Sequence, residues 1–164
     1  MNYQLKELYL MQEQLDKTIH NQHHKSYEST FYERIMALLV ELGELANETR
    51  CFKYWSLKKA SSKEVILEEY SDGLHFILSL GIHLGIDYNE VFTPLQSRTV
   101  LTKAFLDLYA DVIAFQHQTT KDNYRSLVNH FLGLGLLMDI QFSDLFAAYV
   151  AKNKINYERQ KTNY

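Results

Sequence analysis

The chain has 164 residues, enough for one domain, which we expect to span residues 1–164. Six glycines and one proline are too few for the frequent turns of an all-β fold, and 46% hydrophobic against 23% charged residues excludes intrinsic disorder. A net charge of −3 gives no signal for direct nucleic-acid or membrane binding, and Cys51, the only cysteine, excludes an intramolecular disulfide. No signal-peptide core and no membrane-length apolar run is present, so we expect a cytoplasmic protein.

Apolar residues recur at helical spacing in six segments, which predicts an all-α fold, a single-domain bundle of about six helices. The first five predicted helices cover 3–20, 29–52, 63–84, 99–117 and 123–138, and the last begins at Ser143 or Asp144 and runs to about Arg159. Ser61 or Ser62 is the expected N-cap of the third helix, and Gly85 its stop. Residues 21–26 and 56–62 are predicted loops, and 86–94 a turn or short helix. Gly133 and Gly135 are expected to loosen the fifth helix.

Two pairs of acidic residues, each with a spacing of three, lie on the second and third predicted helices: Glu41 with Glu44, and Glu69 with Asp72. Residues three apart share a helical face, so antiparallel neighbouring helices would bring four carboxylates into one small volume. Such repulsion costs stability unless cations neutralise it, and oxygen ligands suit Mg²⁺, with Mn²⁺ as a substitute. The pattern therefore indicates metal-assisted phosphate chemistry, with a solvated acidic face as the alternative.

Groups suited to a nucleoside surround these acids in the sequence. Asp72, His75 and Phe76 share one helical face, where Phe76 is suited to stack on a base and His75 to contact a sugar. Trp55 follows the second helix and is placed to form a second wall. The alternative for each aromatic residue is an ordinary core position.

A polar stripe near the end of the chain has the composition of a phosphate site. Lys152, Asn156 and Arg159 lie at i, i+4 and i+7, which aligns an amide and two cations. Arginine grips phosphate with two parallel hydrogen bonds, and an asparagine amide reads a base edge. A solvated terminal helix is the alternative.

The two acidic pairs resemble the ExxE…ExxD signature of the all-α NTP pyrophosphatases, a MazG-like superfamily. Within it the chain is similar to the dimeric dUTPases over MQEQLD, ELGELANETRCFKYWS, EEYSDGLHF and AYVAKNKINYERQ. The resemblance implies a helical homodimer that hydrolyses dUTP, and dUDP, to dUMP, releasing pyrophosphate or phosphate and keeping uracil out of DNA. For a phage-derived chain, an additional protein partner is left open.

The resemblance also implies roles for individual residues. Glu41, Glu44, Glu69 and Asp72 would hold two or more Mg²⁺ ions, and one of the first two would orient or deprotonate the attacking water. The implied substrate contacts are Gln12 to uracil, Trp55 and Phe76 around the base, Asp72 and His75 at the deoxyribose, Asn156 at the nucleoside, and Lys152 and Arg159 at the phosphates.

Several assignments stay open. Glu48, at i+4 from Glu44, is a candidate fifth acid, with Asn47 as its alternative. Weaker phosphate candidates are Lys53, Lys58 and Lys59. The histidines at 20, 23 and 24 have helical metal spacing but read as a solvated loop. Two other functions compete with dUTP hydrolysis, a MazG-like pyrophosphatase for another nucleotide such as dCTP and a helical protein-interaction module.

Overall fold

The computed structural model describes residues 2–95 and 100–162, which form six helices and two short strands. The helices are α1 (Lys6–His23), α2 (Phe31–Thr49), α3 (Lys63–Leu84), α4 (Leu101–His117), α5 (Lys121–Leu137) and α6 (Phe142–Lys161). The strands β1 (Tyr3–Gln4) and β2 (Val91–Phe92) pair antiparallel. The predicted all-α bundle of six helices is confirmed.

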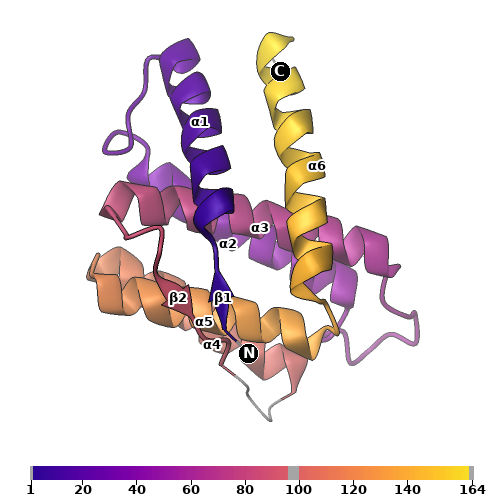
Figure 1. Cartoon of the computed structure of the whole chain (residues 1–164). Coiled ribbons are helices and arrows are strands. Elements are labelled where there is room, and N and C mark those ends of the chain that lie inside the picture. Colours follow the sequence, from indigo (N-terminus) through magenta and orange to yellow (C-terminus); the bar gives the residue numbers. More distant parts are fainter. Residues whose placement is uncertain (1, 96–99, 163–164) are drawn as a thin grey trace.

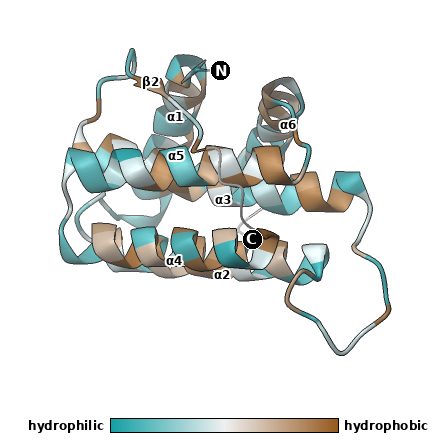
Figure 2. Ribbon diagram, turned by 90° about the horizontal axis from the view of Figure 1, so that it is seen from below, coloured by the Kyte–Doolittle hydropathy of each residue, from teal (hydrophilic) through white to brown (hydrophobic). Residues whose placement is uncertain are grey.

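Helices α2 to α5 form the body of the bundle, and α1 and α6 stand across it (Figure 1). Within the body, α2 packs on α3 and α4, and α5 packs on α3 and α4. Both α1 and α6 contact α3 and each other, on the side of α3 away from α4 (Figure 2). The first and last helices of the chain therefore lie side by side over α3, and with α2 they enclose the space described below.

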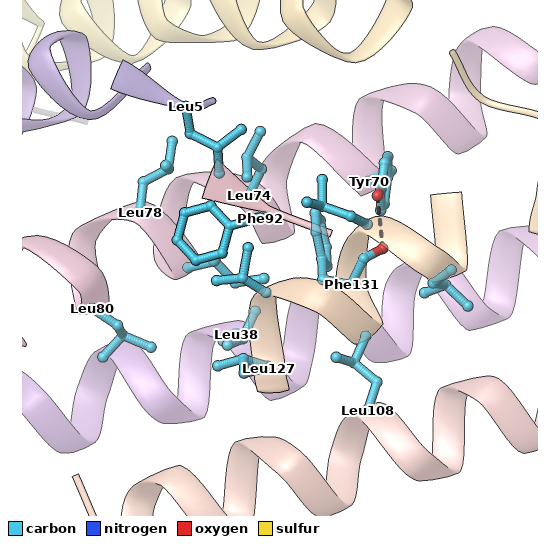
Figure 3. Close-up of a cluster of buried hydrophobic side chains, with 14 of the residues drawn as sticks. Leu5, Leu38, Tyr70, Leu74, Leu78, Leu80, Phe92, Leu108, Leu127 and Phe131 are labelled. Atoms are coloured by element: carbon cyan, nitrogen blue, oxygen red, sulfur yellow. Dashed lines mark hydrogen bonds between the residues drawn. The ribbon is translucent and has the colours of Figure 1, made fainter. Parts of the chain in front are cut away.

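The body is held together by fully buried side chains such as Leu38, Leu74, Leu108 and Phe131, one from each of its four helices (Figure 3). The Tyr70 ring stacks on Phe131 with the ring centroids 4.3 Å apart, and the Tyr70 hydroxyl donates a hydrogen bond of 2.8 Å to the Phe131 carbonyl oxygen. Removing apolar surface of this kind from water is the main stabilising contribution to such a bundle.

The expectation that Gly133 and Gly135 loosen the fifth helix is wrong, because α5 is continuous to Leu137. A Cβ at Gly133 would lie 2.2 Å from the Leu95 carbonyl oxygen, and one at Gly135 would lie 2.5 Å from the Tyr70 hydroxyl. Both glycines therefore permit close approach of neighbouring groups to the helix, at the usual cost of glycine in a helix interior.

The helix boundaries agree best with prediction at α3, which runs from Lys63 to Leu84 with Ser62 as N-cap and Gly85 in the left-handed conformation, φ 68°. The prediction of a helix from residue 3 is wrong, because Tyr3 and Gln4 form β1 and pair with β2. Within 86–94 the predicted turn is present, with the Glu90 N–H donating to the Asp87 carbonyl oxygen at 2.9 Å, but the strand β2 that follows it is not predicted. The buried Tyr3 and Phe92 anchor this pairing.

Smaller boundary differences occur elsewhere. Helix α1 continues through His23 into the predicted loop 21–26. Helix α5 begins at Lys121, where the Thr120 side chain caps the backbone N–H of Asn123. Residue 99, the first of the predicted fourth helix, lies outside the described residues.

Within the described ranges, no single helix is both long and apolar enough to cross a membrane. Helices α5 and α6 reach that length and composition only when taken together, and they are bent by 108° at the break between them.

Candidate active site

Three carboxylates from α2 and α3 converge at one place. One oxygen atom each of Glu41, Glu69 and Asp72 lies within 4.8 Å of the other two, and all three residues are partly buried. Glu44 lies one helical turn beyond Glu41, is exposed, and stays outside this group. The structure thus brings together three of the four predicted acids and leaves the fourth beside them.

Negative charge is concentrated in this cluster. Burial, with the charges of Asp72, Glu44 and Glu69, raises the pKa of Glu41 from 4.5 to about 7. Burial raises the pKa of Glu69 as well, as do the charges of Glu44 and Asp72. The carboxylates oppose each other's ionisation, and a bound cation would relieve that repulsion. An all-oxygen donor set of this kind fits a hard divalent cation.

Lys152 of α6 lies at the edge of the cluster. Its Nζ is 2.7 Å from Asp72 Oδ2 and 3.0 Å from Glu68 Oε1, and only 11% of its side chain is exposed. Burial lowers the pKa of Lys152, but the hydrogen bonds to Asp72 and Glu68 outweigh it and raise the pKa overall. Arg159, two turns further along α6, is close enough for its charge to lower the pKa of Asp72, although burial raises that pKa more. Lys152 therefore contacts the acidic cluster directly, and Arg159 lies within electrostatic range of it.

A cavity of about 450 Å³ opens between α1, α2, α3 and α6. This volume lies in the range of roughly 300–1,000 Å³ found for small-molecule sites. Four residues predicted to contact substrate line it: Gln12, His75, Phe76 and Asn156. His75 and Phe76 follow Asp72 by one turn of α3, so the cavity adjoins the carboxylate cluster.

His75 and Gln12 are fixed in the cavity wall. The Nδ1 atom of His75 is 2.8 Å from Gln12 Oε1, and the ring stacks on Tyr149 with centroids 4.2 Å apart. Burial lowers the pKa of His75 to about 3, so the imidazole is neutral at physiological pH. His75 therefore presents a polar but uncharged surface to the cavity.

Trp55 is not brought to the cavity in the described part of the chain. It is 65% exposed on the loop between α2 and α3, which projects from the bundle (Figure 2), and its ring meets Tyr54 edge to face at 5.1 Å. The role of Trp55 at the base stays a prediction.

The open assignments near α2 resolve into local contacts. The Glu48 carboxylate accepts hydrogen bonds from the Ser61 hydroxyl and the Asn47 amide, and Lys53 donates to Asn47. Glu48 thus fastens the end of α2 to the residues before α3 and lies outside the carboxylate group. Lys58 and Lys59 are exposed.

The three histidines do not form a loop cluster. His20 and His23 belong to the last turn of α1 and line the cavity, and His24 is the C-cap. The metal-type grouping found among the described residues contains none of them.

Sequence reasoning missed three buried polar residues of this wall, Asp16, Arg34 and Ser79. Asp16 Oδ1 accepts a hydrogen bond of 2.8 Å from Gln12 Nε2, and its Oδ2 accepts one of 2.7 Å from Ser79 Oγ. Arg34 Nη1 donates to the Ser79 carbonyl oxygen at 2.9 Å. The sequence does hold a signal for Arg34, which lies next to Ile35 within the apolar stripe of the second helix. A charged residue at such a position indicates a buried polar partner, since charged residues are almost never fully buried without one.

Two comparisons with known proteins bear on this arrangement. A search of curated proteins finds no match to the chain. A family model described as dUTPase matches residues 4–164, a span that includes the carboxylate cluster, the cavity and the α6 cations. A carboxylate cluster beside a cavity of about 450 Å³, with Lys152 at its edge, is suited to the hydrolysis of a nucleoside triphosphate. The chain belongs to the all-α dUTPase family, whose activity is the hydrolysis of dUTP.

Proposed function

We propose that dUTP hydrolysis by this protein depends on Mg²⁺ held by Glu41, Glu69 and Asp72, with Glu44 as a fourth acid, and that dUDP is also converted to dUMP. The observation that carries the proposal is the approach of three carboxylate oxygens within 4.8 Å beside a cavity of about 450 Å³. Its cellular result would be to keep uracil out of DNA.

The chain's own groups have separate tasks in this scheme. A bound divalent cation would lower the pKa of the attacking water and stabilise the negative charge on the phosphoryl oxygens. One of Glu41 and Glu44 orients or deprotonates the water. Neutralisation of the acids by a cation would weaken the ion pair of Lys152 with Asp72. The Lys152 ammonium group would then be available to the phosphates, together with Arg159.

The cavity wall supports recognition of the nucleoside. Gln12 and Phe76 would contact the base, Asn156 the nucleoside and His75 the deoxyribose, with the thymine methyl excluded by close packing at C5. One extra methyl group gives about 1–3 kcal/mol of discrimination, and a steric clash gives more.

We expect a pyrophosphate-release assay with Mg²⁺ to give a kcat/KM for dUTP at least roughly tenfold above that for dTTP and dCTP. Pyrophosphate release is measured for the canonical nucleotides and dUTP, and phosphate release for dUDP, with Mn²⁺ and EDTA as parallel conditions. Equal turnover of dTTP and dUTP would contradict uracil recognition, and a preference for dCTP would favour the MazG-like alternative.

We propose that the protein forms a homodimer through the outer faces of α2 and α4, which pack side by side. Tyr32, Met36 and Val40 follow one another at intervals of four on α2, with Tyr32 68% and Met36 62% exposed. Leu106 and Ile113 of α4 are also exposed. Exposed apolar side chains on two helices that pack on each other support an interaction surface there.

Met36→Glu is therefore expected to convert the dimer to a monomer, measured by size-exclusion chromatography with light scattering. Leu57→Glu, which changes a fully exposed leucine on the loop after α2, serves as the matched control and should leave the mass unchanged. A wild-type protein that is monomeric at all concentrations would contradict the proposal.

A further inference from the structure

A continuous chain of buried side chains runs from α2 through α3 and α1 and ends at His75. Arg34 Nη1 donates to Ser79 Oγ at 3.3 Å, and Ser79 Oγ donates to Asp16 Oδ2 at 2.7 Å. Gln12 Nε2 donates to Asp16 Oδ1, and Gln12 Oε1 lies 2.8 Å from His75 Nδ1. All five residues are buried.

The chemistry of Arg34 and Asp16 fixes the direction of every hydrogen bond in this chain. A guanidinium has no acceptor, so Ser79 Oγ accepts from Arg34 and directs its own proton to Asp16. Both carboxyl oxygens of Asp16 act as acceptors, one from Ser79 Oγ and one from Gln12 Nε2, so the Gln12 amide turns its nitrogen toward Asp16. Burial raises the pKa of Asp16, and the hydrogen bonds from Ser79 and Gln12 and the charge of Arg34 limit that rise.

The orientation of the Gln12 amide decides the tautomer of His75. With its nitrogen toward Asp16, Gln12 faces His75 and Tyr149 with its carbonyl oxygen, which accepts from His75 Nδ1 and, at 2.8 Å, from the Tyr149 hydroxyl. The proton of the neutral imidazole is therefore on Nδ1 and Nε2 is bare. Nε2 is buried and has no hydrogen-bond partner among the described residues. An unpaired buried acceptor is costly, which points to a ligand donor as its partner.

We propose that Asp16 is a positioning residue that, through Gln12, holds His75 as the tautomer whose bare Nε2 accepts a hydrogen bond from the bound nucleotide. The donor is either the 3′-hydroxyl of the deoxyribose or the N3–H of the base. The ligand part rests on the proposed function, whereas the tautomer belongs to the free protein and is tested separately.

Asp16→Asn is the informative change because asparagine keeps the shape of aspartate but replaces one acceptor oxygen by a donor NH₂ group. Ser79, fixed by Arg34, still donates to the residue at position 16, so the asparagine oxygen turns toward Ser79 and its NH₂ toward Gln12. The Gln12 amide then turns over and donates to His75 Nδ1, and the imidazole proton moves to Nε2. Ser79→Ala is the matched control, since it removes a buried hydrogen bond from the same carboxylate but leaves Asp16 an acceptor.

The first experiment is a two-bond ¹⁵N–¹H correlation spectrum of the histidines in the free protein at pH 8. The expected result is a neutral Nδ1–H tautomer for His75 in wild type and Ser79→Ala, and an Nε2–H tautomer in Asp16→Asn. An Nε2–H tautomer in the wild type, or an unchanged tautomer in Asp16→Asn, overturns the positioning role. The wild-type spectrum tests the predicted tautomer of His75 even where a variant fails to fold.

The second experiment identifies the donor by comparing dUTP with 2′,3′-dideoxyuridine triphosphate and N3-methyl-dUTP. In the wild type, the analogue lacking the relevant donor should lose roughly tenfold in kcat/KM. In Asp16→Asn the loss disappears for N3-methyl-dUTP if the donor is the N3–H, because an N3–H cannot accept from an Nε2–H and dUTP itself becomes a poorer substrate with a raised KM. A 3′-hydroxyl can accept as well as donate, so the loss for the dideoxy analogue is reduced but not abolished if the hydroxyl is the donor. Equal losses in both proteins for both analogues overturn the contact between Nε2 and the nucleotide, and they do so without touching the tautomer result. Absence of any turnover of dUTP by the wild type would instead contradict the proposed function.

Discussion

Replacing Glu41 by Gln, or Asp72 by Asn, is expected to lower kcat for dUTP hydrolysis by roughly 10²–10³-fold. Each change keeps the side-chain volume but removes one of the three carboxylates whose oxygens approach within 4.8 Å. A neutral amide is a poor ligand for a hard divalent cation, and the remaining acids no longer balance its charge. Pyrophosphate release at increasing Mg²⁺ measures the effect, and the Mg²⁺ concentration for half-maximal rate should rise in both variants.

Asp107→Asn is the matched control for this experiment. Asp107 lies on α4, pairs with Lys103, and is partly exposed. Its replacement also removes one carboxylate, so it reproduces the change in net charge without touching the cluster. Full activity of Glu41→Gln and Asp72→Asn, with an intact fold by circular dichroism, would remove the acids from the mechanism.

The sequence predicts the body of the fold well because its signals are local. Apolar residues at helical spacing define six helices, and Ser62 and Gly85 mark the two ends of α3. Strands β1 and β2 escape prediction because two residues are too short to show alternation, and their pairing joins segments far apart in the chain. The expectation for Gly133 is wrong for a related reason. Helix propensity describes only the local chain, so it does not reveal that the Leu95 backbone approaches this glycine.

The same difference between local signals and contacts of distant segments applies to the candidate site. Glu41, Glu69 and Asp72 are found from spacing alone, because residues three apart on a helix share a face. Asp16 and Ser79 are not, since their role depends on how α1, α2 and α3 cross. Lys152 is predicted as a phosphate ligand, yet the structure pairs it with Asp72, a contact between helices that no local pattern encodes.

The acidic cluster also has a consequence for stability, because Glu41→Gln is expected to stabilise the metal-free protein at pH 8. The folded-state pKa of Glu41 is raised from 4.5 to about 7, so the folded protein binds this proton more tightly than the unfolded chain. The resulting stabilisation is fully present below about pH 4.5 and is lost as the pH rises through about 7. The full shift corresponds to about 3 kcal/mol, which solvent screening at this partly exposed side chain reduces to about 1 kcal/mol.

Urea denaturation in EDTA at pH 5 and pH 8 measures this effect. Above the folded-state pKa the wild type carries the repulsion among Glu41, Glu69 and Asp72, whereas Glu41→Gln does not, so the variant should be the more stable protein at pH 8. The advantage should shrink at pH 5, where the folded wild type protonates Glu41. Asp107→Asn should show neither change.

Magnesium should reverse the order of stability. A cation that binds only the folded state stabilises it by mass action, and the wild type, with its full set of carboxylates, gains more than Glu41→Gln. The two proteins should therefore exchange rank between EDTA and excess Mg²⁺ at pH 8. A variant that is less stable than the wild type in EDTA at pH 8 would show that these carboxylates do not repel one another, and the electrostatic case for a cation at this place would fail with it.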